Sequence, residues 1–282
     1  MPPLPDIIPV ILAGGEGRRL WPLTGPNRPK PFLKLRGRSL LQMTATRMTD
    51  MQAPVVVANL RHAEMVQRDL KDCNVTPQQI FLEPEGRGTA PAAAVAAHYF
   101  RGSGADPLLL VMPSDHLIER PAVLQAAVQR GAARARQGDL VMFGVAPRHA
   151  ATGYGYIRRG GENDNVTQFV EKPDRQAARQ FLNERESWLW NSGIFLFSAS
   201  AFLDRLKVCD PVLHDASRNA VTRASRRQNA VLLDESSFLA CPAASLDRAV
   251  MEKDGARAAL PVEMGWRDLG SRASFLRCLM GI

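Results

Sequence analysis

Residues 8–35 read IPVILAGGEGRRLWPLTGPNRPKPFLKL, and this stretch decides the fold. A short apolar run, Val10–Leu12, leads directly into a loop with three glycines in four residues. Glycines let the backbone approach a ligand closely and leave amide N–H groups free to face phosphate oxygens. Arg18 and Arg19 place fixed positive charge beside the loop, and Lys30 follows on a stiff, proline-bracketed segment. The stretch therefore predicts a strand that ends in a phosphate-binding loop.

Two common phosphate-binding motifs do not match this loop. A P-loop requires G-x-x-x-x-G-K-[ST], which does not occur here, and a dinucleotide fingerprint fails because Leu20 stands where its third glycine is required. The whole string instead resembles the signature loop of the sugar-1-phosphate nucleotidyltransferases. Within that family it is most similar to the version in mannose-1-phosphate guanylyltransferases (GDP-mannose pyrophosphorylases), in a short form without a C-terminal isomerase domain.

The composition is that of an ordinary soluble globular chain, with 282 residues, 45% hydrophobic and 23% charged. No apolar run approaches the roughly 18 residues of a membrane span, so no membrane partner is expected. The first residues lack a basic region ahead of an apolar one, so we expect no secretory signal and a cytoplasmic location. Four scattered cysteines should then be free thiols.

The net charge of +8 raises the question of a nucleic-acid partner. The basic residues are dispersed, however, and residues 223–227 form the only tight cluster outside the signature loop. We therefore predict no nucleic-acid binding and assign the local basic clusters to small anionic substrates.

Apolar segments of strand length alternate with amphipathic segments of helix length, which predicts an α/β fold with a mostly parallel sheet and helices on both faces. The resemblance implies a Rossmann-like three-layer nucleotide-diphospho-sugar transferase fold. We expect one domain over 1–282, with a nucleotide half (1–150), a sugar-phosphate half (151–270) and a short C-terminal helix (271–282). Predicted strands are 8–12, 54–58, 79–82, 108–112, 140–145, 154–158, 166–171, 193–197, 230–233 and 258–262. Predicted helices are 39–51, 61–71, 90–101, 121–136, 174–183, 199–206, 211–225 and 245–252.

Two carboxylates stand out as candidate metal ligands. Asp115 follows a buried-looking run in VMPSDH, where the carboxyl end of a strand would place it at a ligand-binding edge. Asp268 lies in GWRDLGS. Either aspartate alone would more often be a helix cap or turn residue, but both motifs resemble the family's pair of Mg²⁺ ligands. His116 is expected to be a structural hydrogen-bonding residue, because Mg²⁺ prefers oxygen.

The second half carries the residues that the resemblance assigns to the sugar phosphate. In FVEKP, Lys172 should pair with the phosphate and Glu171 with sugar hydroxyls. In TGYGY, Gly153 should let the backbone reach the ring, and in WNSGI, Asn191 should hydrogen-bond the hexose. The stretch SLDRAVMEK, residues 245–253, is typical of the guanylyltransferases. Trp188 and Trp190 are interpreted as core residues.

The resemblance also implies a base-reading segment, EPEGRGTAP at 83–91. Relatives usually carry asparagine where Gly88 stands, so Gly88 is expected to keep the loop's shape at the loss of one hydrogen bond, about 0.5–1.5 kcal/mol. The residues predicted to bind the nucleotide are Leu12, Ala13, Gly14, Gly15, Gly17, Arg87, Thr89, Ala90 and Ser114.

The activity that the resemblance implies is Mg²⁺-dependent formation of GDP-mannose and pyrophosphate from GTP and α-D-mannose 1-phosphate. Arg19 would hold the departing pyrophosphate, Lys30 the α-phosphate region and Lys172 the attacking phosphate. Two alternatives stay open: a transferase of the same fold with another base or hexose, and a non-catalytic subunit that senses nucleotide sugar. The chain stops fourteen residues after Asp268, so the family's usual C-terminal route to a homodimer is not expected, and a homodimer stays an open option.

Overall fold

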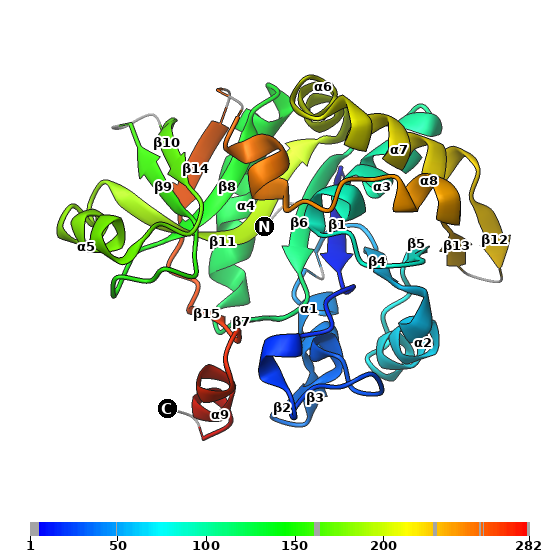
Figure 1. The fold of residues 1–282 in the computed structure, drawn as a ribbon, viewed down its shortest axis with the longest axis horizontal. Coiled ribbons are helices and arrows are strands. Elements are labelled where there is room, and N and C mark those ends of the chain that lie inside the picture. Colours follow the sequence, from blue (N-terminus) through cyan, green and yellow to red (C-terminus); the bar gives the residue numbers. More distant parts are fainter. Residues whose placement is uncertain are drawn as a thin grey trace.

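A mixed β-sheet forms the centre of the molecule (Figure 1). The computed structural model describes residues 6–48, 50–160, 164–227, 230–253, 255 and 257–280. Within them the sheet runs in the order β10-β9-β11-β6-β1-β4-β5-β13-β12, and β8 joins β11 to β14. The strands are β1 (Ile7–Leu12), β4 (Val55–Asn59), β5 (Gln79–Glu83), β6 (Leu108–Pro113), β8 (Leu140–Val145), β9 (Tyr156–Arg159), β10 (Val166–Val170), β11 (Trp188–Ser198), β12 (Ser225–Arg227), β13 (Ala230–Leu232) and β14 (Arg257–Pro261).

The direction of the strands divides the sheet into two parts. Strands β6, β1, β4, β5 and β13 are all parallel, as predicted for the first half of the chain. Strand β11 is antiparallel to β6, β8 and β9, and β8 pairs with β14 in parallel. The carboxyl ends of β1, β4, β5 and β6 therefore lie together at one edge, where an open α/β sheet binds its ligand.

Helices cover both faces of the sheet, which confirms the predicted three layers (Figure 1). Alternate residues of β1 enter two different cores: Ile7 and Ile11 pack on one face, Ile8 and Val10 on the other. Helices α1 (Leu40–Ala45), α2 (Ala63–Asp72) and α4 (Pro121–Arg136) bury side chains in the first core, and α3 (Thr89–Gly102), α6 (Ala199–Cys209) and α7 (Pro211–Thr222) in the second. Helix α5 (Arg175–Asn183) contributes Ala178 and Phe181 to the first core, and the short α8 (Glu235–Leu239) contributes Phe238 to the second.

Three predicted elements differ from the observed ones. The helix predicted at 39–51 ends at Ala45, where threonines at 44 and 46 bond backbone carbonyls through their hydroxyls. The strand predicted at 193–197 begins at Trp188, because residues 188–190 pair with β9. The helix predicted at 245–252 is a π-helix, η5 (Asp247–Met251). Trp188 and Trp190 are buried, as predicted.

A smaller unit outside the main sheet supports the end of β1. Strands β7 (His116–Ile118) and β15 (Trp266–Asp268) form an antiparallel ribbon, and β2 (Lys34–Leu35) pairs with β3 (Arg38–Ser39). Helix α9 (Arg272–Met280) is the predicted C-terminal helix. It buries Phe275 and Cys278 in a third apolar cluster with Leu20, Leu117 and Leu269. This cluster ties the C-terminal helix to the signature loop and to the ribbon.

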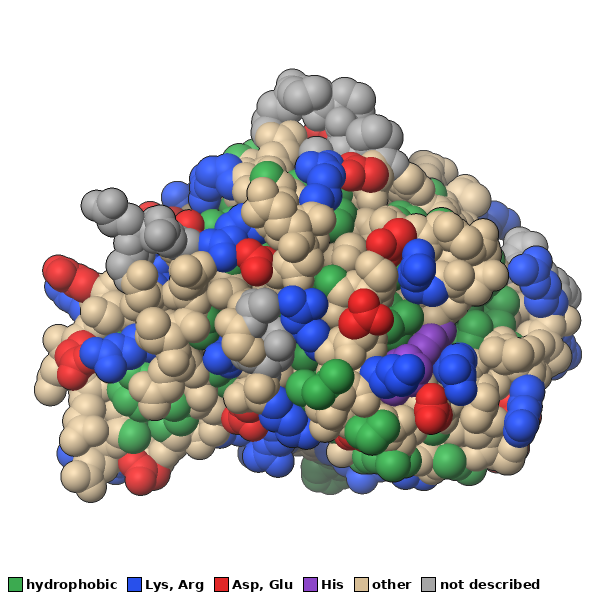
Figure 2. All heavy atoms as spheres, turned by 90° about the horizontal axis from the view of Figure 1, so that it is seen from above, with side chains coloured by type: hydrophobic (Ala, Val, Ile, Leu, Met, Phe, Trp, Pro, Cys, Tyr) green, Lys and Arg blue, Asp and Glu red, His purple; other side chains and the backbone are tan. Residues whose placement is uncertain are grey.

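Figure 2 shows Lys and Arg side chains interspersed with Asp and Glu, without a continuous basic patch on this face. Of the helices in the described residues, none combines the length and hydropathy needed to span a bilayer.

Candidate functional site

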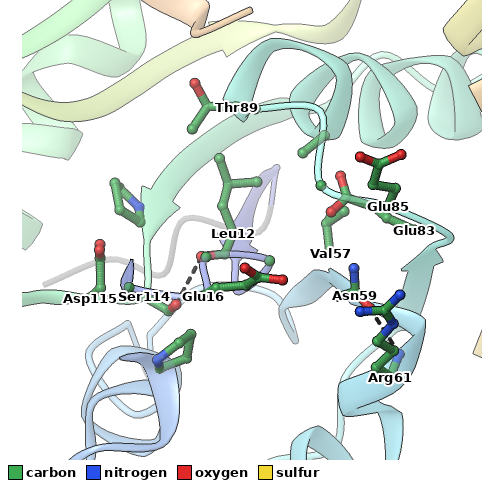
Figure 3. A pocket seen from close by; sticks show the side chains of 18 of the residues that line it. Leu12, Glu16, Val57, Asn59, Arg61, Glu83, Glu85, Thr89, Ser114 and Asp115 are labelled. Atoms are coloured by element: carbon green, nitrogen blue, oxygen red, sulfur yellow. Dashed lines mark hydrogen bonds between the residues drawn. The ribbon is translucent and has the colours of Figure 1, made fainter. Parts of the chain in front are cut away.

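A pocket of about 860 Å³ opens at the carboxyl ends of β1, β4, β5 and β6. In Figure 3, Ser114 and Asp115 lie on one side of this pocket and Glu83 on the other, with Leu12 between them. Six of the nine predicted nucleotide-binding residues line it: Leu12, Gly14, Gly15, Gly17, Thr89 and Ser114. Ala13 and Ala90 are fully buried beneath the pocket wall, and Arg87 is half-buried and does not line it.

The hydrogen bonds of the signature loop decide which of its groups can meet a ligand. The Ala13 amide donates to Val57 O at 2.7 Å, and the Leu12 carbonyl accepts from both the amide and the hydroxyl of Ser114. The amides of Gly14 and Gly15 have no acceptor among the described residues. The amide of Gly17 also has no acceptor there, so the predicted backbone contacts from this loop are narrowed to Gly14, Gly15 and Gly17, whose N–H groups are available to an anion or a base.

Gly17 closes the loop in a conformation that glycine alone adopts easily. Its φ is +70°, and a Cβ there would lie 2.6 Å from the Cβ of Lys30. The loop therefore packs directly on Lys30, which is buried.

Glu83 is the most unusual group in the pocket wall. The residue is 3% exposed, and its Oε1 has no hydrogen-bond partner among the described residues. Burial raises the pKa of Glu83 to about 8. Its Oε2 lies 2.7 Å from where a Gly14 Cβ would be, so the carboxyl group reaches the signature loop. A buried polar atom without a partner is costly, and its presence in a pocket points to a ligand that supplies the donors.

The base loop, residues 87–90, is held by the chain near residue 244. Ala244 N donates to Arg87 O at 3.0 Å, and Ala90 N donates to Ala244 O at 3.2 Å. Gly88 has φ +94°, and a Cβ at this residue would lie 2.3 Å from the Ala244 carbonyl oxygen. This geometry agrees with the expectation that Gly88 keeps the loop's shape, because no side chain fits the loop in this conformation, and the loss of one hydrogen bond stays a prediction.

The β7–β15 ribbon brings the two predicted metal ligands together. Asp268 pairs with His116 in the ribbon, so Asp115 and Asp268 become neighbours although they are far apart in sequence. Lys30 Nζ lies 2.7 Å from Asp115 Oδ2 and 3.7 Å from Asp268 Oδ1. Burial opposes the charged form of Asp115, but the Lys30 ammonium group, through its charge and its hydrogen bond, helps to lower the pKa of Asp115 below the usual range. Both carboxylates thus face the ammonium group of Lys30.

The side chain of His116 is held in one tautomer. Trp266 Nε1 donates to His116 Nδ1 at 3.2 Å, which leaves the proton on Nε2. That nitrogen faces Asp115 Oδ1 at 3.7 Å and Asp268 Oδ1 at 3.9 Å. Burial lowers the pKa of His116, which favours this neutral form. The geometry agrees with the predicted structural role of His116.

The donor set fits Mg²⁺. Two carboxylates face one point, and Mg²⁺ in proteins is commonly held by one or two carboxylates together with water and substrate phosphates. Among the described residues, no group of three or more His, Cys, Asp or Glu is arranged to enclose a metal ion. The pair therefore suits a metal that takes most of its ligands from a phosphorylated substrate.

Arg19 lies beside the same cluster. It lines a pocket of about 250 Å³ together with Lys30, Asp115 and Gly270, and this pocket shares Gly17, Arg18 and Asp115 with the larger one. Arg19, Lys30 and Asp115 therefore border one continuous region.

The predicted sugar-phosphate residues form a second group. Lys172 Nζ donates to Glu171 Oε1 at 2.5 Å, and the Lys172 side chain is 52% exposed whereas that of Glu171 is 7% exposed. Lys172 has φ +47°, an uncommon conformation for a residue with a side chain. A Cβ at Gly155 would lie 2.8 Å from Glu171 Oε2 and 3.4 Å from Asn191 Cβ, whereas a Cβ at Gly153 would meet nothing within 4 Å. Gly155 is therefore the glycine that the packing of this group requires, and the role of Gly153 stays a prediction.

Aromatic rings connect the sugar-phosphate group to the ribbon. Tyr154 packs edge-to-face on Trp190 and on Trp266, with ring centroids 5.2 Å apart in both pairs. Trp266 in turn packs on His116 at 5.4 Å. These rings give the two groups of charged residues a common rigid support.

Several site residues were not predicted although their motifs were recognised. Glu83 stands at the first position of the base-reading segment and Gly155 within TGYGY. Asp247 lies in SLDRAVMEK and accepts a hydrogen bond from Asn191. The motif strings contained these residues, but no spacing rule distinguishes them from their neighbours.

Comparison with known proteins agrees with this geometry. Residues 8–282 match the protein family described as Nucleotidyl transferase, and the chain belongs to this family. It is 46% identical over 276 residues to the xanthan biosynthesis protein XanB of Xanthomonas campestris pv. campestris (strain B100), covering 96% of this chain and 59% of that protein. It is 42% identical over 281 residues to the mannose-1-phosphate guanylyltransferase of Escherichia coli (strain K12), covering 95% and 59%. The chain thus spans less than two thirds of the length of these relatives.

A solved structure shows the same fold. The protein named mannose-1-phosphate geranyltransferase from Thermus thermophilus superimposes with a TM-score of 0.82 at 30% identity, over 94% of this chain and 76% of that one. This similarity confirms the predicted fold class.

Proposed function

We propose that the protein is a Mg²⁺-dependent mannose-1-phosphate guanylyltransferase, which makes GDP-mannose and pyrophosphate from GTP and α-D-mannose 1-phosphate. Support comes from the relatives with that name, from the paired carboxylates of the ribbon, and from the sugar-phosphate group beside them. None of the described cysteines forms a disulfide, which is compatible with the reducing cytoplasm, where we place the reaction.

The proposed reaction needs positioning and charge neutralisation rather than a side-chain nucleophile. A phosphate oxygen of the sugar phosphate attacks the α-phosphorus of GTP in line, and the bond to the leaving pyrophosphate breaks. Arg19 would hold the pyrophosphate, Lys30 the α-phosphate and Lys172 the attacking phosphate. Asp115 and Asp268 would hold Mg²⁺, which neutralises phosphate charge and acts as a Lewis acid.

Glu83 is the observation that favours guanine over the other bases. A carboxylate only accepts hydrogen bonds, and the guanine edge offers adjacent N1–H and N2–H donors that match its two oxygens. Adenine and the pyrimidines place an acceptor beside their donor, so one carboxylate oxygen would face a lone pair. We infer that Glu83 reads guanine and that the Gly14 and Gly15 amides complete the contact.

The ionisation of Glu83 makes GTP binding pH-dependent. Because the pKa of Glu83 is about 8, roughly a tenth of the free protein carries the carboxylate at pH 7. The KM for GTP should therefore fall roughly tenfold between pH 7 and pH 9. Glu83→Gln should remove this pH dependence and lower the preference for GTP over ATP by roughly 10²-fold, because an amide presents N–H groups to guanine donors.

The matched control for this experiment is Glu64→Gln, on the exposed surface of α2. It should keep the parent pH profile and base preference. A Glu83→Gln enzyme with an unchanged GTP preference would exclude this residue as the reader of the base.

Lys172→Ala should lower kcat/KM for mannose 1-phosphate by roughly 10²-fold, because the charge that holds the attacking phosphate is lost. The KM for GTP should change little. Steady-state pyrophosphate release at varied mannose 1-phosphate measures both constants, and near-normal turnover at low sugar phosphate would refute the role.

The whole assignment is tested by pyrophosphate release from purified protein with Mg²⁺, with GTP, ATP, UTP and dTTP each paired with mannose 1-phosphate and glucose 1-phosphate. A preference for GTP with mannose 1-phosphate supports the proposal. Activity with another pair keeps the mechanism and changes the specificity. No activity with any pair, together with GDP-mannose binding, would identify a regulatory subunit.

A further inference from the structure

The segment 244–252 contacts both halves of the candidate site. At the base loop, Leu246 N donates to Thr89 Oγ1 at 2.8 Å. At the sugar-phosphate group, Asn191 Nδ2 donates to Asp247 Oδ1 at 2.5 Å, and Glu171 N donates to Glu252 Oε1 at 3.3 Å. The sequence predicted this stretch as typical of guanylyltransferases but assigned it no role.

Both polar atoms of the Asn191 side chain form hydrogen bonds within the protein. Its Oδ1 accepts from the Gly193 amide at 3.0 Å, and one hydrogen of its Nδ2 is used by Asp247. Its backbone amide donates to Gly155 O at 2.8 Å. The second Nδ2 hydrogen and the second lone pair of Oδ1 are left for a ligand, and their direction is set by the bonds to Asp247 and Gly193.

The negative charge of Asp247 is unfavourable at this position. Burial, followed by the nearby charge of Glu171, raises the pKa of Asp247 to about 6. Among the described residues, the side chain of Asp247 accepts a hydrogen bond from Asn191. A half-buried carboxylate beside a second carboxylate is unfavourable for the fold, which points to a contribution in the site that it contacts.

We propose that Asp247 is a positioning residue for the hexose, which acts by orienting the Asn191 amide toward a sugar hydroxyl. The inference rests on the proposed function, since the hexose is the ligand that Asn191 is assigned to bind. Because Asp247 would act through Asn191, its removal should affect the sugar part of a ligand and leave the nucleotide part unchanged.

The test compares the affinities of GDP-mannose and GDP for the parent protein, Asp247→Ala, Asn191→Ala and the double variant, by isothermal titration calorimetry. Asp247→Ala should weaken GDP-mannose binding by about tenfold and leave GDP binding unchanged. Asn191→Ala should have a similar effect, and the double variant should bind no more weakly than Asn191→Ala, because the two residues act as one unit. Asp247→Asn keeps an acceptor oxygen for the amide and should restore most of the affinity.

The outcomes separate the positioning role from the proposed function. Independent, multiplying effects of the two alanine variants would overturn the proposal, as would an Asp247→Ala protein with parent affinity or with equally weakened GDP binding. Asp204→Asn, on the exposed side of α6, controls for the loss of an acidic group. If the parent protein binds GDP-mannose no better than GDP, the proposed function fails before Asp247 is tested.

Discussion

Asp115→Asn is expected to lower kcat/KM for nucleotidyl transfer by roughly 10³-fold. Asparagine keeps the size of the side chain and can still accept a hydrogen bond from Lys30. It removes, however, one of the two negative charges that are proposed to hold Mg²⁺. Asp268 would then face Lys30 alone, at the observed 3.7 Å. The loss should be accompanied by a much higher Mg²⁺ requirement, measured as pyrophosphate release over a Mg²⁺ titration.

The control makes the same aspartate-to-asparagine substitution at a residue that lies far from the ribbon in the fold. Asp204→Asn should retain parent activity and Mg²⁺ requirement, because Asp204 is exposed on α6. A thermal melting curve checks that Asp115→Asn is folded. Activity within tenfold of the parent at ordinary Mg²⁺ concentration would show that Asp115 does not hold the metal.

Gly88→Ala is expected to destabilise the protein by about 3 kcal/mol and to raise the KM for GTP at least tenfold. The estimate combines about 1–3 kcal/mol for a side chain at φ +94° and ψ −176°, a region essentially restricted to glycine, with about 1–3 kcal/mol for overpacking. The added Cβ would lie 2.3 Å from the Ala244 carbonyl oxygen, which is backbone and cannot rotate away. Either the base loop or the segment at Ala244 must therefore move, and the base loop carries Gly88 and Thr89, which line the candidate nucleotide pocket.

Gly138→Ala is the control for a positive φ without a steric clash. Gly138 has φ +95°, almost the value of +94° at Gly88, but a Cβ there would meet nothing within 4 Å. It should therefore lose only the conformational part, about 1–2 kcal/mol, and keep the parent KM for GTP. Chemical denaturation measures both stabilities; equal losses in the two variants would refute the clash at Ala244.

The sequence was a good guide to the fold where periodic burial extends over a whole element. Helix α4 was predicted at its observed bounds, Pro121–Arg136, because proline begins it and polar and apolar residues alternate with helical spacing along it. The ribbon strands β7 and β15 were not predicted, since three residues give no readable period. Their pairing depends on tertiary contacts that sequence spacing does not reveal.

The candidate site was predictable as a set of motifs but not as a set of contacts. The resemblance of three motifs to those of the family predicted Lys30, Asp115 and Asp268 in one site. The structure brings these three side chains together. The same reasoning selected Gly153, whereas packing selects Gly155, because only the folded chain shows which glycine faces Glu171. The unpartnered state of Glu83 likewise depends on what surrounds it after folding.

The ribbon has a consequence for the order in which the molecule becomes functional during synthesis. Its first strand is made before residue 120, but the second, which carries Asp268, leaves the ribosome only after the strands of the main sheet. A nascent chain can therefore assemble the sheet and most of the nucleotide pocket while it still lacks one of the two carboxylates. Premature termination before residue 266 would give a protein with a nucleotide pocket but without this pair, so that it could sequester nucleotide without turnover.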